Sequence, residues 1–318
     1  MPLTLGLLAL SAAAVAPLAL PGAAGAASTT TPTTATPGAA SSTPTTAAPS
    51  APATPATPAT KAFTLPGRVV ALSQPQADSS MWVLAGTSTK KSIYHVNVNK
   101  QKVLGKESVS AHADAIALSA NNYTLALGTT GGAYPAVVWY YGITSRFNNA
   151  ARSTAPVTSL AVNAAGNTIY ALRSSASQKS VYALGTANSL GFPYLIPGTP
   201  VDIAPATDGH SMLVLQSDGT VGSLSLPAGV YTTSFGTGAP AKALALSPDG
   251  TTAYVLRSQA ATTPTGSIVE VNVAQGTVIK TIATTGDVVD IVLSADGHTL
   301  YEAQWGTKDS SIRAIAVP

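Results

Sequence analysis

The sequence contains no cysteine, and only 9% of its 318 residues are charged. The absence of cysteine excludes disulfides and a structural thiolate metal site, so the folded part must be held together by its core. The 16 Lys and Arg residues and the 13 Asp and Glu residues are scattered, with no basic run. This distribution is unlike the basic surface of a nucleic-acid-binding protein. We therefore expect no nucleic-acid partner.

Helical periodicity and catalytic motifs are also missing. After Lys61 no apolar stripe recurs at the i, i+3, i+4, i+7 spacing of an amphipathic helix, which excludes helical solenoids. The chain has no G-x-S-x-G, H-E-x-x-H or phosphate-loop motif. Its four histidines do not have the spacing of a metal site. We therefore expect no metal and no other cofactor.

What the chain does have is a repeated hairpin pattern, clearest in Ala241–Ser258. There the apolar run Ala243–Leu246 is followed by the turn Ser247–Gly250 and by a second apolar run, Ala253–Leu256. Two β-rich runs around an Asp-Gly turn are a strong hairpin signal. The matched residues before the turn lie 41 to 47 residues apart: Ser73, Ser119, Asn163, Ala206, Ser247 and Ser294. A period in the forties made only of strands predicts a β-propeller with one four-stranded blade per repeat.

The spacing predicts six blades, the last of which is incomplete. The final repeat supplies only three strands, whereas a spare apolar strand around Phe63 (Ala62–Leu65) precedes the first repeat. We predict that this strand pairs with the C-terminal strand Ser311–Val317, because a closed ring leaves no exposed sheet edge. The expected fold class is therefore all-β, a propeller formed by residues 62–318.

The segment before the propeller has two parts. Residues 1–27 contain an Ala/Leu-rich apolar stretch and Ala24-Gly25-Ala26, which fits the A-x-A rule for signal peptidase, although Met1–Thr4 has no basic residue. A cleaved signal peptide is the favoured interpretation and an uncleaved membrane anchor is the alternative; both export the protein. Residues 28–61 are almost wholly Thr, Pro, Ala, Ser and Gly, which is typical of a disordered, extended stalk that also suits O-glycosylation.

Polar residues at one end of each hairpin should surround one mouth of the central channel. They are Arg68, Asp114, Arg173, Asp202, Gln216, Lys242, Arg257, Asp290 and Gln304, together with His112 and Trp305. Odd repeats supply bases and even repeats supply acids, so opposite charges lie side by side. One interpretation is a belt of ion pairs between blades. The other is a polar pocket for a small ligand or a sugar.

Three smaller features of the repeats complete this picture. Trp305 and Tyr134 could form a stacking surface near the mouth. His112 and Asp114 could form a general-base dyad, although the favoured interpretation is a solvated pair of loop residues without a catalytic role. The recurring Asp-Gly pairs begin at Asp208, Asp249 and Asp296. We interpret them as structural, because the turn needs residues that tolerate a positive φ.

The repeat consensus, an apolar strand, Ser-x-Asp-Gly and then Tyr-Val or Tyr-Ala, resembles the YVTN-type β-propeller repeat. The resemblance is closest at Leu246–Leu256, Leu293–Tyr301 and Val162–Leu172, although Leu256-Arg257 stands where the name-giving motif has Thr-Asn. It covers the chain after the stalk and implies a secreted or surface-layer-associated propeller, some relatives being similar to lactonases of the phosphogluconolactonase type. Many relatives have seven blades, which makes seven the alternative to six. No catalytic residue can be transferred, because no site motif matches.

These observations favour an exported, non-enzymatic propeller, secreted or attached to the cell surface on a stalk. Its channel mouth would bind a ligand, and a protein or a glycan at the cell surface is the expected class of partner. One alternative is a lactonase-like hydrolase or a lyase that acts through Asp114, Asp202, Asp290 and His112. The other is an assembly subunit of a surface layer or fibre.

Overall fold

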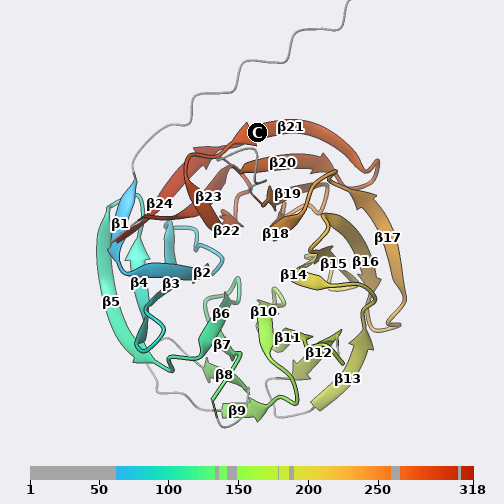
Figure 1. The fold of residues 1–318 in the computed structure, drawn as a ribbon, viewed down its shortest axis with the longest axis horizontal. Helices are drawn as coiled ribbons and strands as arrows, with labels where there is room; N and C mark the ends of the chain where they lie inside the picture. The colour runs from blue at the N-terminus through green and yellow to red at the C-terminus, as the bar shows by residue number, and fades with distance from the viewer. Residues whose placement is uncertain are drawn as a thin grey trace, which may run out of the picture. The chain divides into compact units, whose positions relative to one another are not determined.

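The computed structural model describes residues 62–132, 136–141, 149–177, 179–185, 190–258, 266–306 and 309–318. In these residues 24 strands form six antiparallel sheets of four strands, which fan around a common centre as a β-propeller (Figure 1). The predicted signal peptide and stalk lie outside the described residues, as does Tyr134. Within the described residues no helix has the length and apolarity needed to span a bilayer.

Five of the sheets are each built from four consecutive strands, ordered from the centre outward in Figure 1. Sheet 1 contains β2 (Arg68–Leu72), β3 (Ser80–Gly86), β4 (Lys91–Asn97) and β5 (Lys102–Val109), and sheet 2 contains β6 (Ala113–Leu118), β7 (Thr124–Thr129), β8 (Ala136–Tyr141) and β9 (Asn149–Arg152). Sheet 3 contains β10 (Val157–Val162), β11 (Thr168–Ser174), β12 (Lys179–Gly185) and β13 (Leu190–Leu195). Sheet 4 contains β14 (Pro200–Pro205), β15 (Ser211–Gln216), β16 (Thr220–Ser225) and β17 (Tyr231–Gly236), and sheet 5 contains β18 (Ala241–Leu246), β19 (Thr252–Arg257), β20 (Ser267–Asn272) and β21 (Thr277–Ala283).

Sheet 6 combines the two ends of the described chain. It contains β22 (Asp287–Leu293), β23 (Thr299–Trp305), β24 (Asp309–Ala316) and, on its outer edge, β1 (Phe63–Pro66). β1 runs antiparallel to β24, with Phe63 opposite Ile312 and Leu65 opposite Ser310. The predicted closure of the last sheet by the strand around Phe63 is confirmed.

Buried side chains hold this closure. Phe63 and Leu65 are 6% and 1% exposed, and they belong to a core cluster that also contains Tyr301 of sheet 6 and Met81 of sheet 1. Burying each such side chain contributes about 1.5–3 kcal/mol. The short strand β1 therefore stabilises both its own sheet and the junction with sheet 1.

The turn between the first two strands of a sheet repeats one hydrogen-bond pattern. In sheet 5 the Ser247 hydroxyl donates to Asp249 at 2.5 Å and accepts from the Thr252 amide at 2.9 Å. Gly250 has a φ of 74°, a conformation that glycine adopts without strain. Ser294 and Asp296 make the equivalent contacts in sheet 6. The hydrogen bonds support the structural interpretation of the Asp-Gly pairs, and those from Ser247 and Thr251 lower the pKa of Asp249.

Candidate functional site

The innermost strands of the six sheets, β2, β6, β10, β14, β18 and β22, surround a central cavity of about 440 Å³. Each of these strands pairs with a neighbour in its own sheet on one side only. The free edge of such a strand directs unpaired backbone amide and carbonyl groups away from the sheet, here toward the cavity. The polar side chains that line the cavity include Asp114, Ser159, Asp202, Lys242 and Asp290.

Each inner strand has a β-bulge near its start, and the bulge determines the position of each following side chain along the channel. The bulged residues are Val70, Asp114, Thr158, Val201, Lys242 and Val289. Asp202 and Asp290 each follow the bulged residue of their strand, whereas Asp114 is itself the bulged residue. The three acids that the repeat pattern placed together are therefore divided into an equivalent pair and a third residue in a different position.

Asp202 connects three neighbouring sheets. Its Oδ1 accepts a hydrogen bond from the Ser159 hydroxyl of sheet 3 at 2.7 Å and one from the Ile203 amide of its own strand at 2.9 Å. Its Oδ2 accepts from the Leu244 amide of sheet 5 at 2.7 Å. The carboxylate thus accepts hydrogen bonds from backbone amides at the inner edges of sheets 4 and 5 that have no partner among the described residues of their own sheet.

Asp290 makes the equivalent contacts between the last sheet and the first. Its Oδ1 accepts from the Ile291 amide at 2.8 Å, and its Oδ2 accepts from the Leu72 amide of sheet 1 at 2.7 Å. This contact lies at the same junction between sheets 6 and 1 at which the Val69 amide donates to Ser310 Oγ at 2.9 Å. Asp290 therefore also contributes to the closure of the ring.

The two carboxyl groups have raised pKa values for identifiable reasons. Burial raises the pKa of Asp202 to about 6, although the hydrogen bonds from Ser159, Leu244 and Ile203 act in the opposite direction. Burial and then repulsion by the Asp202 charge raise the pKa of Asp290 to about 8, against the hydrogen bonds from Leu72 and Ile291. At neutral pH the pair consequently retains one proton, shared between two interacting sites.

No cation offsets the charge of this pair within the described residues. Lys242 lines the cavity, but its Nζ is 3.0 Å from Asp287 Oδ1, which joins sheets 5 and 6. The described residues also contain no group of three His, Asp or Glu side chains arranged to hold a metal ion. The pair can accept hydrogen bonds from a molecule in the cavity, and it can give or take one proton near neutral pH.

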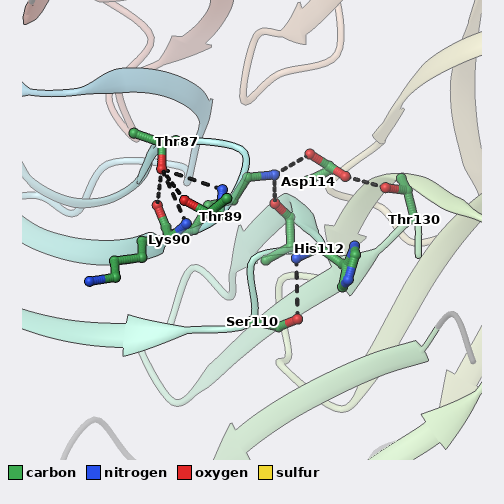
Figure 2. Close-up of polar contacts among 9 residues, drawn as sticks. Thr87, Thr89, Lys90, Ser110, His112, Asp114 and Thr130 are labelled. Carbon is green, nitrogen blue, oxygen red and sulfur yellow. Dashed lines mark hydrogen bonds and ion pairs between the residues drawn. The ribbon is translucent and has the colours of Figure 1, made fainter. Parts of the chain in front are cut away.

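Asp114 belongs to a separate cluster that joins sheets 1 and 2. Its Oδ1 forms an ion pair of 2.5 Å with Lys91 of β4, and its Oδ2 accepts from the Thr130 hydroxyl (Figure 2). The backbone amide of His112 donates to Ser110 Oγ at 3.2 Å, and the His112 imidazole ring packs against Gly131. In the described part of the chain His112 and Asp114 share no hydrogen bond, so the structure does not show the dyad considered from the sequence.

Four other members of the predicted ring share a different position, at the end of the second strand of a sheet. They are Arg173, Gln216, Arg257 and Gln304, and none of them is among the described residues that line the cavity. Each side chain donates to the loop that leads into its own sheet, to Thr154 Oγ1, Pro197 O, Thr237 O and Thr285 Oγ1 respectively. The loop contacts give these residues a repeated structural role, and a role in binding stays a prediction.

Arg68 and Trp305 meet at the junction of sheets 1 and 6. The Arg68 guanidinium carbon lies 3.9 Å from the centroid of the Trp305 ring, a cation–π contact. Trp305 is 43% exposed, and neither residue lines the cavity. The aromatic face expected to stack on a ligand is in contact with Arg68 instead.

The sequence interpretation missed three residues that hold the polar groups of the inner strands. Ser159 contacts Asp202, Lys91 contacts Asp114, and Asp287 contacts Lys242. Ser159 could have been found in the repeat alignment, because it stands four residues before the matched residue Asn163, as Asp202 and Asp290 stand four residues before Ala206 and Ser294. Lys91 lies on the third strand of sheet 1, and no feature of the repeat pattern indicates that it reaches the next sheet.

No protein-family model and no curated protein sequence matches this chain. Among solved structures the chain is similar to a chain of Kuenenia stuttgartiensis Hydrazine Synthase, with 13% sequence identity and a TM-score of 0.59. The similarity covers 78% of this chain and 83% of that chain. At this identity the similarity supports the propeller fold alone, because one fold serves many unrelated functions.

Proposed function

We propose that this protein is a non-enzymatic, six-bladed propeller that binds a small ligand in its central cavity. The observation that carries the proposal is the Asp202–Asp290 pair, which lines the cavity without a basic partner in the described residues and holds raised pKa values. Buried acids without a cation are costly, and strongly shifted pKa values are concentrated at functional sites. The hydrogen bonds from amides of the inner strands explain how each carboxyl group is held, and the raised pKa values of the pair favour a role in binding.

Export and display at the cell surface are part of the same proposal. The A-x-A sequence before residue 27 and the Thr/Pro/Ala-rich composition of residues 28–61 suit a secreted or surface-attached protein on a stalk. The YVTN-like repeat points in the same direction. Cell fractionation with protease treatment of intact cells tests this part, and a protein that stays protected inside the cell would contradict it.

Ligand binding is tested by screening small metabolites for a rise in melting temperature. A ligand of the cavity should stabilise the wild-type protein, and Asp202→Asn and Asp290→Asn should each change its affinity about tenfold or more: the affinity falls for a ligand that donates hydrogen bonds to the pair and rises for an anionic ligand that the pair repels. Asp208→Asn is the matched control, since Asp208 lies in an exposed turn outside the cavity lining and accepts only from the His210 amide in the described contacts. Ligands whose binding is equally insensitive to all three substitutions would contradict a cavity site.

The same pair supports a second candidate function, hydrolysis or elimination. Two carboxyl groups with separated pKa values can divide the roles of general base and general acid, here Asp202 and Asp290. Turnover of simple lactones or esters by the wild-type protein, lost in a correctly folded Asp290→Asn variant, would favour this function over binding alone. We rank it second because both carboxyl groups are already engaged by two or three hydrogen-bond donors.

A further inference from the structure

At the level of Asp202 and Asp290, each inner strand has one residue that lies two positions after its bulge. These residues are Leu72, Ile116, Leu160, Ile203, Leu244 and Ile291. Four of the six backbone amides donate to an aspartate: Ile203 and Leu244 to Asp202, Ile291 and Leu72 to Asp290. The six amides form a ring around the channel, and the two aspartates accept hydrogen bonds from four of them.

The two remaining amides, of Ile116 and Leu160, point toward the same space. Three residues after each of them, the amides of Ser119 and Asn163 donate inside their own sheets, to Thr124 O and Thr168 O. Successive amides of an antiparallel strand alternate between its two sides, so an amide three positions earlier faces away from the sheet. The Leu244 amide has the same relation to Ser247, whose amide donates to Thr252 O, and Leu244 reaches Asp202 in the cavity.

The ring is arranged as three pairs of neighbouring sheets. Asp202 joins the amides of sheets 4 and 5, and Asp290 joins those of sheets 6 and 1. In the third pair, sheets 2 and 3, the residue that follows the bulge of sheet 2 is Ala115. This pair thus has the same two amides and no carboxylate of its own, because Asp114 is one position earlier and is held by Lys91 and Thr130.

We propose that the carboxyl group of a small organic acid binds at this third position and accepts hydrogen bonds from the amides of Ile116 and Leu160. The inference rests on the proposed function and names the chemical class of its ligand. Ala115, Ile116 and Leu160 all line the cavity, so the position is reached from its interior. The rest of the ligand occupies the cavity beside the aliphatic side chains of the inner strands.

Binding of this carboxylate is coupled to the uptake of one proton. A third negative charge near Asp202 and Asp290 raises their proton affinity, so the ligand anion and a proton from the buffer bind together. The other charged side chains on the inner strands are Arg68, Asp114, Lys242 and Asp287, of which Asp114 is paired with Lys91 and Lys242 with Asp287. For one coupled proton the affinity should increase by up to about tenfold for each pH unit between pH 8 and pH 6.

The experiment is an NMR titration of the full-length, ¹⁵N-labelled protein with sodium butyrate at pH 6 and pH 8. The amide signals of Ile116 and Leu160 should move in a saturable way and at lower concentration at pH 6. Those of Leu72 and Leu244 should move less, because their amides already donate to aspartates. Butylamine and 1-butanol are the matched probes, with the same alkyl chain but without the carboxylate.

Replacing either of two alanines with aspartate sharpens the test. Ala115→Asp supplies a carboxylate at the third position and should weaken butyrate binding at least about tenfold by occupying the two amides. Ala243→Asp adds the same charge after the bulge of sheet 5, where the adjacent amides of Leu244 and Ile291 already have acceptors. That control adds the charge without an acceptor for the amides of Ile116 and Leu160, so it should weaken butyrate binding much less than Ala115→Asp does, and the wild-type titration remains decisive if either variant fails to fold.

Different results separate the failure of this inference from the failure of the proposed function. If butylamine moves the cavity signals and butyrate does not, or if butyrate acts away from Ile116 and Leu160, the carboxylate inference is wrong while a cavity ligand remains. If neither these probes nor the screened metabolites move any signal from the inner strands, both the inference and the proposed function are contradicted.

Discussion

The Asp290 carboxyl group links the chemistry of the cavity to the stability of the fold. Its pKa is raised from 3.8 to about 8 in the folded chain, so between these values the folded state binds more protons than the unfolded state. The free energy of unfolding must then fall as the pH rises from about 4 to about 8. Asp202, with a pKa of about 6, adds to the fall only at the lower end of this range.

Asp290→Asn removes the ionisable group and should flatten the pH profile above pH 6. The wild-type protein should lose on the order of 3 kcal/mol of unfolding free energy between pH 5 and pH 8, and the variant should lose much less. Urea unfolding at pH 5, 6.5 and 8 measures both. Asp296→Asn is the control, because the pKa of this exposed turn residue is lowered and its contribution is already complete above about pH 4. If Asp290→Asn keeps the wild-type dependence of unfolding free energy on pH, the raised pKa of Asp290 does not cause that dependence and the prediction is wrong.

Individual residues of the predicted ring show where sequence reasoning stops. The repeat pattern placed Asp202 and Asp290 in a ring at the channel mouth, and in the structure both line the cavity. It placed Arg173 and Gln216 on the same rim, but these side chains donate to Thr154 and Pro197 in loops of their own sheets. A long side chain at a strand end can turn either way, and its choice depends on the position of a loop that is distant in sequence.

At the scale of single elements, the closing strand β1 is the clearest success of the sequence analysis. Its alternating burial, with Phe63 and Leu65 inward and Thr64 and Pro66 outward, follows the two-residue period of a strand. The bulges of the inner strands were not predicted. Asp114 stands five residues before the matched residue Ser119 and Asp202 stands four residues before Ala206. The sequence shows this offset of one residue, but only the bulge gives it a structural meaning, because Asp114 is the bulged residue and Asp202 follows it.

Phe63→Ala tests the contribution of this strand to the fold. Phe63 is 6% exposed and packs in the cluster that joins sheets 6 and 1, so the substitution should lower the unfolding free energy by about 3–5 kcal/mol. Leu195→Ala on β13, the outermost strand of sheet 3, is the control. Leu195 is 72% exposed, so its substitution should change the unfolding free energy by less than about 0.5 kcal/mol. Urea unfolding of the two variants at one pH provides the comparison. Equal losses would show that β1 does not stabilise the ring.

At the scale of the whole molecule, six sheets that meet at one cavity explain both the composition and the site. Small residues such as Ala115, Ala117 and Ala243 are buried on the inner strands, where adjacent sheets approach most closely. The same convergence brings acids from sheets 4 and 6 within electrostatic range of one another, although they are far apart in sequence. The repeat period indicated such a centre, but only the assembled ring shows that the two acids share it and that Lys242, which also lines it, is paired with Asp287.

The most direct test of this account is a ¹³C NMR titration of the Asp202 and Asp290 side-chain carboxyl carbons in the full-length protein. We predict two coupled transitions, one near pH 6 and one near pH 8, with the upper transition lowered in Asp202→Asn because the repelling charge is removed. Transitions of both carboxyl groups near pH 4, unaffected by substitution of the other, would contradict the coupled acid pair on which the proposed cavity site depends.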